Sequence, residues 1–209
     1  RCVMGNMSAE EFKSLINVPR ETMDQFICYS ELLIKWQKSI NLVSKSTLSN
    51  MWRRHFFDSA QLFEYIDVKE KPLTILDLGS GAGFPGLVLS IFGAGQVHLV
   101  EGVGKKCAFM KQVIQKTGID AIVHNERIEQ MDAFPVDLLT SRACAELEKL
   151  LDLTSPFMKA DTECLFLKGV KSEQEIERAT KKWAFELKKY TSKSEESGMI
   201  LKLSHLKGR

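Results

Sequence analysis

The sequence has no paired cysteines and no histidine motif that would hold a metal. Its five cysteines, an odd number in 209 residues, include no CxxC spacing, and its four histidines include neither HExxH nor a close Cys/His group. Dispersed cysteines of this kind are typical of reduced thiols in a cytosolic protein, and the missing ligand spacing argues against zinc. We therefore expect a cytoplasmic protein without a metal centre. The cysteines are Cys2, Cys28, Cys107, Cys144 and Cys164, and the histidines are His55, His98, His124 and His205.

Long apolar runs and a strong charge bias are also lacking. The apolar stretch Gly86–Gly95 is too short to span a bilayer, and no basic segment followed by an apolar one begins the sequence. We therefore expect no membrane association and no secretory signal, and we expect a monomer. Twenty-nine basic and 27 acidic residues give a net charge of +2, which permits nucleic-acid binding without arguing for it.

The first third of the chain is predicted to be helical. Ser8 and Glu11 have the spacing of a capping box at the start of one helix. Apolar residues at helical spacing predict a second helix over Arg20–Gln37 and a third over Leu48–Tyr65. We predict that residues 1–70 form a helical N-terminal extension packed on a larger domain of residues 71–209.

From Leu73 onward, short apolar runs alternate with helical patterns. Continuous apolar runs indicate strands buried on both faces, and strand–helix alternation indicates a parallel sheet, so the fold class is α/β and doubly wound. Two last strands, joined by the polar turn Lys193–Gly198, predict an antiparallel hairpin at one sheet edge. The predicted strands are Thr74–Leu78, Val97–Glu101, Ala121–His124, Val136–Ser141, Glu163–Lys168, Glu186–Ser192 and Met199–His205. The predicted helices are Pro85–Phe92, Lys105–Thr117 closed by Gly118, Glu146–Lys159, and Ser172–Trp183 with a capping box of Ser172 and Glu175.

The most informative segment is the glycine-rich stretch Ile75-Leu-Asp-Leu-Gly-Ser-Gly-Ala-Gly-Phe-Pro-Gly86. It lies where the first strand should end and the next helix begin, the place at which open α/β sheets bind ligands. Gly79, Gly81 and Gly83 permit positive φ and close approach of a ligand to the backbone. The segment therefore predicts a ligand-binding loop; the alternative is a tight turn without a ligand.

An acidic residue follows the loop at a meaningful distance. Glu101 ends the second predicted strand, 18 residues after Gly83. A carboxylate at about this distance accepts hydrogen bonds from the ribose hydroxyls of a nucleoside cofactor. The strand, loop, helix, strand and acid together favour a nucleoside cofactor over a strand-end carboxylate without a function.

Two cofactors fit the glycine spacing. Gly81–Gly86 matches the GxGxxG pattern of nicotinamide cofactors, which place a pyrophosphate at a helix N-terminus. Asp77, two residues before the first glycine, would repel a pyrophosphate but suit the sulfonium and ammonium groups of S-adenosylmethionine. The acid favours S-adenosylmethionine and leaves a nicotinamide cofactor as the alternative.

With these residues placed, the chain resembles the ribosomal RNA small subunit methyltransferase G family, also called GidB, from about Trp36 to Lys171. Each shared motif is weak alone, but their order and spacing are specific. The motifs are Asn41-Leu-Val, Arg54-His-Phe-Phe-Asp-Ser59, Asp77-Leu-Gly-Ser-Gly-Ala-Gly-Phe-Pro-Gly86, Val100-Glu-Gly-Val-Gly-Lys-Lys106, Arg127-Ile-Glu129, Ser141-Arg-Ala143 and Leu167-Lys-Gly169. Two positions depart from the family's usual pattern while keeping their charge, Lys106 for an arginine and Glu101 for an aspartate.

The resemblance implies a class I S-adenosylmethionine-dependent methyltransferase with a Rossmann-like, seven-stranded sheet. It implies methyl transfer to N7 of a guanine in 16S rRNA, either free or in the 30S subunit. The loop glycines would line the methionine part of the cofactor, Glu101 its ribose, and Ile128 and Glu129 its adenine. The cofactor-binding residues implied in this way are Asp77, Gly79, Gly81, Gly83, Phe84, Glu101, Ile128, Glu129 and Arg142.

The expected chemistry assigns Arg142 a positioning role. Guanine N7 has an in-plane lone pair and no proton at neutral pH, so its methylation needs no general base. The protein would contribute orientation of the reacting atoms and exclusion of water. Because N7 must stay free to react, an arginine would contact O6 instead. Arg142, at the end of the fourth predicted strand, is the candidate for this neighbourhood, for the methyl group or for the cofactor carboxylate.

Four residues are predicted to contact RNA: Arg54, His55, Lys106 and Lys168. For Arg54 and His55 the alternative is a solvated helix face on which Asp58 pairs with Arg54 at i,i+4. Lys106 is as well explained by surface solvation, whereas Lys168 ends a strand on the ligand side of the sheet. A small-molecule methyltransferase, an NAD-dependent oxidoreductase and a non-catalytic RNA-binding protein remain the competing functions.

Overall fold

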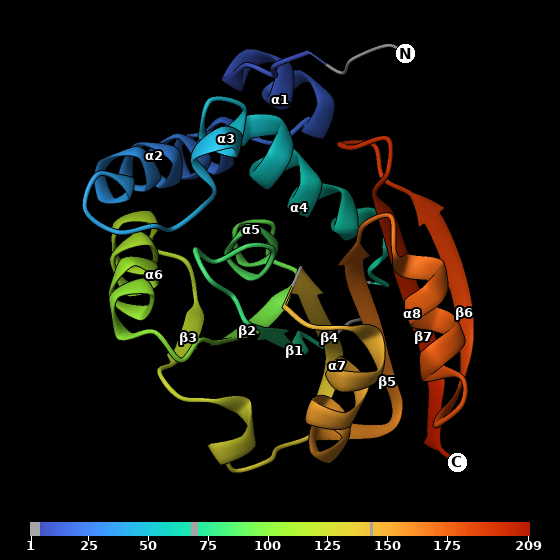
Figure 1. Ribbon diagram of the computed structural model, residues 1–209. Helices are drawn as coiled ribbons and strands as arrows, with labels where there is room; N and C mark the ends of the chain where they lie inside the picture. Colours follow the sequence, from blue (N-terminus) through green and yellow to red (C-terminus); the bar gives the residue numbers. More distant parts are fainter. Residues whose placement is uncertain (1–4, 68–70, 143) are drawn as a thin grey trace.

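Seven strands form one sheet in the computed structural model, which describes residues 5–67, 71–142 and 144–209. Their order is β3-β2-β1-β4-β5-β7-β6 (Figure 1). Neighbours among β1 to β5 are parallel, and β7 runs antiparallel between β5 and β6. The mainly parallel sheet with a C-terminal hairpin is thereby confirmed. The strands are β1 Leu73–Leu78, β2 Gly95–Val100, β3 Ala121–His124, β4 Val136–Arg142, β5 Met158–Lys168, β6 Trp183–Thr191 and β7 Met199–Gly208.

Helices cover both faces of this sheet. α5 (Gly86–Ile91) and α6 (Gly104–Thr117) share one hydrophobic core with the N-terminal helices, whereas α7 (Leu147–Thr154) and α8 (Ser172–Ala179) pack in a second core. In β5, Leu165 belongs to the first core and its neighbour Phe166 to the second. Both faces are therefore buried, which explains why the strands read as continuous apolar runs.

The N-terminal helices pack directly on the sheet core. They are α1 (Ala9–Ile16), α2 (Arg20–Gln37), α3 (Lys45–Leu48), the π-helical η1 (Trp52–Phe57), α4 (Asp58–Ala60) and the 3-10 helix η2 (Gln61–Tyr65). The capping box of Ser8 and Glu11 is confirmed. The single helix expected over Leu48–Tyr65 is instead a succession of helix types, and its π-helical part carries Arg54 and His55. Widened turns of this kind occur often at functional sites.

Several predicted boundaries after β4 were wrong. The helix expected to reach Lys159 ends at Thr154, because Pro156 in η4 (Ser155–Phe157) lacks the N–H that a longer helix needs, and β5 begins at Met158. α8 ends at Ala179, so Trp183 begins β6 instead of ending a helix. α8 also begins without the expected capping box: its N-cap residue is Lys171 and makes no side-chain cap bond.

The turn between β6 and β7 reaches back to the N-terminal helices, as Figure 1 shows at the top of the sheet. Gln61 donates through Nε2 to the Ser192 hydroxyl at 3.0 Å and accepts from the Lys193 backbone N–H at 2.8 Å. Segments 131 positions apart in the sequence therefore meet near the carboxyl ends of the parallel strands. The domain boundary predicted at residues 70 and 71 adjoins residues 68–70, which lie outside the described residues. Within the described ranges, no helix combines the length and apolarity needed to cross a membrane.

Candidate active site

The glycine loop joins β1 to α5 and has the predicted backbone geometry. Gly79, Gly81 and Gly83 have φ angles of 62°, 58° and 91°, which lie in the region that only glycine adopts without strain. The Gly83 N–H donates to the Ser80 carbonyl at 2.7 Å, closing the turn. The loop is therefore a preformed backbone structure at the carboxyl edge of the sheet.

The three glycines serve different purposes. A Cβ on Gly79 would lie 2.3 Å from the Cys144 sulfur, and a Cβ on Gly83 would lie 2.3 Å from Leu87 Cδ1. A Cβ on Gly81 would meet only the Gly79 carbonyl oxygen, at 3.8 Å. Gly79 and Gly83 therefore allow the protein to pack on itself, whereas Gly81 leaves the open face that a ligand can approach.

Glu101 lies beside this open face. It follows β2, is 9% exposed, and accepts hydrogen bonds from the backbone N–H groups of Gly81 at 3.0 Å and Val103 at 2.8 Å. The carboxylate is thus fixed against the loop at the edge where a nucleoside would bind. Its contact with a ribose stays a prediction, and each carboxylate oxygen keeps a second lone pair that can accept from a ribose hydroxyl.

Asp77 lies beneath the loop, away from the face that Gly81 leaves open. Its side chain is fully buried and accepts from the Thr140 hydroxyl at 2.8 Å and from the Gly86 N–H at 3.3 Å. Burial raises the pKa of Asp77 to about 6, although these hydrogen bonds lower it. Asp77 thus joins the loop, the start of α5 and β4, and its interaction with the cofactor cations stays a prediction.

Phe84 also faces the protein. It is buried and stacks on Tyr29 of α2 with ring centroids 5.1 Å apart, while His55 stacks on it at 5.2 Å. The Tyr29 hydroxyl donates to the carbonyl of Ala82 in the loop. Phe84 is thus a contact through which the N-terminal helices hold the loop, and its part in cofactor binding stays a prediction.

The expected adenine contacts lie on a short 3-10 helix, η3 (Ile128–Gln130). Ile128 is buried in the core that contains Leu78 and Val100, and Glu129 is exposed. η3 follows β3, which is the neighbour of β2 in the sheet. The segment therefore follows the strand next to the one that Glu101 follows. Its contact with adenine stays a prediction.

Arg142 ends β4 and is held by groups from the N-terminal helices. Its Nη1 donates to the Arg54 carbonyl at 3.0 Å and lies 3.5 Å from the Asp58 carboxylate, and its guanidinium carbon lies 5.1 Å from the Phe84 ring centroid. Asp58 also accepts from Gln61 Nε2 at 3.1 Å and from the Ser194 hydroxyl. Arg142 is therefore oriented by a carboxylate that the C-terminal turn helps to hold.

His55 is buried and neutral. Its Nε2 lies 2.8 Å from the Thr47 hydroxyl, which itself donates to the Ser44 carbonyl, so Nε2 carries the proton and Nδ1 the lone pair. No residue in the part of the chain that the structure describes provides a hydrogen-bond partner for Nδ1. Burial and the nearby Arg142 lower the pKa of His55 to about 3. A neutral imidazole offers no charge to a phosphate, and the contact of His55 with RNA stays a prediction.

A cavity of about 700 Å³ opens beside the loop at the carboxyl ends of β4 and β5. It brings together three of the four predicted RNA-binding residues, Arg54, His55 and Lys168, with Arg142; Lys106 does not line it. Lys106 lies in the first turn of α6 and is half-buried. Cys144, whose sulfur faces Gly79, lines the cavity too, so the cavity and the glycine loop adjoin.

Each basic side chain expected to bind RNA in this cavity has an acidic partner. Arg54 Nη1 lies 2.8 Å from Glu195, not in the predicted pair with Asp58, which instead faces Arg142. Lys168 is buried; its Nζ lies 2.7 Å from Glu175 and 2.6 Å from the Ala145 carbonyl. Glu175, expected in a capping box, therefore balances Lys168.

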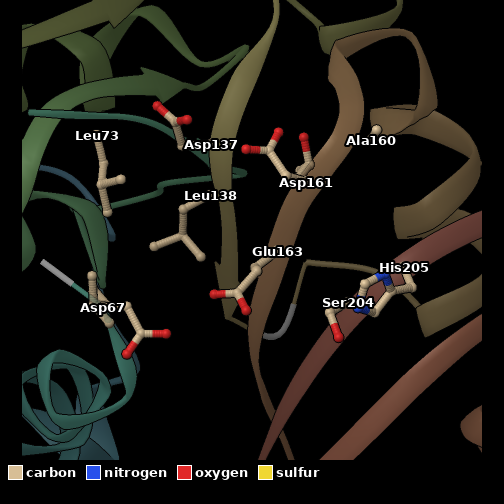
Figure 2. Close-up of a pocket in the computed structure, with 11 residues that line it drawn as sticks. Asp67, Leu73, Asp137, Leu138, Ala160, Asp161, Glu163, Ser204 and His205 are labelled. Carbon is tan, nitrogen blue, oxygen red and sulfur yellow. The ribbon is translucent and has the colours of Figure 1, made fainter. Parts of the chain in front are cut away.

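A second cavity, of about 240 Å³, lies at the opposite, amino ends of the strands. Figure 2 shows the carboxylates of Asp67, Asp137, Asp161 and Glu163 around it. Lys159 lies 2.6 Å from Asp137, and Lys202 lies 3.1 Å from Glu163. Each lysine faces two of the four carboxylates, because Lys159 also lies 3.3 Å from Asp161 and Lys202 also lies 3.3 Å from Asp67. The group lies at the edge of the sheet away from the glycine loop.

Comparisons with known proteins agree with this geometry. The family model described as GidB, rRNA small subunit methyltransferase G, matches residues 22–200. The ribosomal RNA small subunit methyltransferase G of Rhodospirillum centenum is 44% identical over 96% of this chain and 92% of its own length. That of Parvibaculum lavamentivorans is 43% identical over 97% of this chain and 91% of its own.

Solved structures of low identity share the fold. An S-adenosylmethionine-dependent methyltransferase from Aquifex aeolicus aligns with a TM-score of 0.58 at 17% identity, over 81% of this chain and 96% of that one. A mutant of MtNAS in complex with S-adenosylmethionine aligns with a TM-score of 0.59 at 13% identity, over 95% and 84%. With a family model that covers most of its length and relatives above 40% identity, the chain belongs to the ribosomal RNA small subunit methyltransferase G family.

Proposed function

We propose that this protein transfers a methyl group from S-adenosylmethionine to N7 of a guanine in 16S rRNA, in the cytoplasm. The observation that carries the proposal is the junction between the glycine loop and the 700 Å³ cavity, which meet at Cys144 beside Arg142. A cofactor on the loop and a base in the cavity would be neighbours there. Membership of the family, whose members are named for the small-subunit RNA, supplies the substrate class.

The loop favours S-adenosylmethionine over a nicotinamide cofactor. The N–H of Gly86, at the start of α5, already donates to the buried carboxylate of Asp77. A pyrophosphate at this helix N-terminus would compete with that carboxylate and be repelled by its charge. S-adenosylmethionine has no phosphate, so the open side of Gly81 can receive its amino-acid part and Glu101 its ribose hydroxyls.

The proposed reaction needs the protein to orient the reacting atoms and does not need it to transfer a proton. The N7 lone pair forms the new N–C bond as the S–C bond breaks, and the positive charge passes from sulfur to the base. No proton leaves N7, so no side chain in the cavity needs to act as a base. Arg142, fixed by Asp58 and by the Arg54 carbonyl, would donate to guanine O6 and leave N7 facing the loop.

The remaining contacts would hold the RNA. Arg54 is about one-third exposed at the cavity and would meet phosphate, and Lys106 would meet phosphate outside the cavity. Lys168, deeper and paired with Glu175, would contact the nucleotide in the cavity. His55 Nδ1 would accept a hydrogen bond from a ligand or from a rearranged neighbour, because a buried acceptor without a donor is costly.

The test is methylation of defined RNAs with radiolabelled S-adenosylmethionine. Purified protein is incubated with 16S rRNA and with 30S subunits from cells that lack the gene, and the label is mapped. Label at N7 of one guanine, absent with an Arg142→Ala variant that still binds the cofactor, is the expected result. Cofactor binding without label on either RNA would overturn the proposal in favour of a small-molecule substrate, and binding of NAD alone would favour an oxidoreductase.

A further inference from the structure

The cavity proposed to receive RNA is electrically balanced. Four basic and four acidic side chains line it: Arg54, Arg142, Lys168 and Lys171, and Asp58, Glu146, Glu175 and Glu195. RNA-binding surfaces gain affinity by placing unpaired cations against phosphates. An RNA phosphate that meets Arg54, Arg142 or Lys168 would therefore take the place of a carboxylate that already faces that side chain.

Two of the acids that face a cavity cation are tied into the fold. Asp58 is 15% exposed in its side chain and also accepts from Gln61 and Ser194. Glu175, 14% exposed, accepts from the Leu147 backbone N–H at 2.9 Å besides pairing with Lys168. Displacing either carboxylate would leave buried donors unpaired, which costs free energy. These two acids are permanent parts of the cavity wall.

Glu195 differs from them in each respect. Its side chain is 41% exposed, it lies on the β6–β7 turn, and Arg54 is the ion-pair partner that the described residues provide for it. The turn is fixed at its base by Ser192, Lys193 and their bonds to Gln61. The Glu195 carboxylate can therefore swing away without unfolding the turn, and Arg54, 34% exposed, is then free on the cavity side.

We propose that Glu195 occupies the phosphate position of Arg54 in the free protein and is exchanged for an RNA phosphate when the correct substrate binds. The carboxylate makes the same charge-assisted hydrogen bond that a phosphate oxygen would make. Arbitrary RNA must displace it without the compensating contacts of a fitting base in the cavity, so Glu195 lowers non-specific binding more than specific binding. It is a specificity-determining residue, and this role rests on the proposed RNA substrate.

The chain contains its own control for this role. Glu196 is the next residue, is exposed, and does not line the cavity. Glu195→Gln and Glu196→Gln change the net charge equally and lie on the same turn. Any general electrostatic effect on RNA affinity is therefore common to both variants. A difference between them reports the release of Arg54.

The experiment measures binding of a random-sequence RNA oligomer and of 30S subunits to the full-length protein and both variants. Glu195→Gln should bind the random RNA about two- to fivefold more tightly than Glu196→Gln, the range expected for one partly exposed ion pair. Its affinity for 30S subunits should rise less, so the specificity ratio falls. Adding Arg54→Gln to Glu195→Gln should abolish the gain. Thermal unfolding midpoints that match between the two single variants exclude a folding effect.

Two outcomes separate failure of this role from failure of the proposed function. If the protein methylates 16S rRNA but both single variants bind random RNA equally, Glu195 does not guard Arg54 and the inference is wrong. If neither the protein nor its variants methylate or bind RNA while S-adenosylmethionine still binds, the RNA substrate itself is wrong, and the role of Glu195 falls with it.

Discussion

The glycine loop and the cavity beside it share one edge of the sheet, but they are built differently. The loop is one continuous segment, Asp77–Gly86, and its shape is set by backbone angles and by N–H groups that bond within the protein. The cavity combines side chains from the π-helical segment, the ends of β4 and β5, α8 and the β6–β7 turn. A site formed by the backbone should be sensitive to substitutions that add atoms, whereas a site formed by paired charges should be sensitive to substitutions that remove a charge. The two regions should therefore respond to different perturbations.

The largest effect should come from filling space in the loop. In Gly83→Ala the new Cβ would lie 2.3 Å from Leu87 Cδ1 and 2.8 Å from the Tyr29 hydroxyl, at a φ of 91°. Overpacking together with backbone strain should lower the free energy of unfolding by about 3–5 kcal/mol. Gly81→Ala meets open space and should cost only about 1–2 kcal/mol, through backbone strain, yet weaken S-adenosylmethionine binding. Urea unfolding and calorimetric titration measure both, and equal destabilisation by the two variants would contradict the division of roles.

Lowering the pH should raise the free energy of unfolding through Asp77, the buried carboxyl beneath the glycine loop. The folded-state pKa of about 6 exceeds the usual 3.8, so the folded protein takes up the proton first. The stabilisation is fully present below pH 3.8 and is lost as the pH rises through 6. The free energy of unfolding of the wild type, relative to Asp77→Asn, should fall by about 2.4 kcal/mol between pH 4 and 7. Urea unfolding across that range is the measurement, and a pH-independent difference would show that burial does not govern this carboxyl.

Lowering the pH should reduce the free energy of unfolding through His55, which lines the cavity. The folded-state pKa of about 3 lies below the usual 6.5, so the unfolded chain binds the proton first. The stabilisation is present above pH 6.5 and is lost as the pH falls toward 3. Relative to His55→Gln, the wild type should lose about 2 kcal/mol of unfolding free energy between pH 7 and 5. His205→Gln, at an exposed position, is the control. Opposite pH responses of Asp77 and His55 would sharpen the contrast between the two regions.

The smallest of these effects should be the fall in kcat when Asp58, whose charge orients Arg142, is made neutral. Asp58→Asn keeps an acceptor for Gln61 and Ser194 but no longer balances the guanidinium. We expect kcat for 16S rRNA methylation to fall about tenfold, a change of about 1.4 kcal/mol, with the KM for S-adenosylmethionine unchanged. Asp152→Asn, at an exposed pair with Lys182, is the matched control. A raised cofactor KM with an unchanged kcat would place Asp58 in cofactor binding instead.

The same contrast explains what the sequence could predict. The strands and the glycine loop depend on local patterns: apolar runs, glycines and the spacing from Gly83 to Glu101. The hydrogen bond between Asp77 and Thr140 could not be predicted, because the two residues lie 63 positions apart. Asp58 was paired with Arg54 by helical spacing, but the π-helical turn that carries Arg54 and the end of β4 bring Asp58 to Arg142. No sequence pattern predicted the ion pair between Glu195 and Arg54. Such a pair depends on burial and on contacts between distant parts of the chain.

The boundary errors after β4 have a related cause. Apolar periodicity continued past Thr154, so the helix was extended through Pro156 to Lys159 although a proline rarely lies inside a helix. Ser172 and Glu175 had the capping-box spacing, yet Glu175 is drawn to Lys168 and to the Leu147 N–H. A stronger tertiary partner thus overrode a valid local signal, and it did so beside the proposed active site.

The hydrogen bond between Gln61 and Ser192, which lie 131 positions apart, can form only after most of the described chain has been synthesised. A nascent chain that has emerged as far as β5 already contains the glycine loop, Glu101 and Arg142, and its parallel sheet can begin to form. The β6–β7 turn leaves the ribosome after all of these, because synthesis runs from the N-terminus onward. Closing so long a loop is slow. We therefore expect the glycine loop and Glu101 to be in place before the wall of the 700 Å³ cavity is complete.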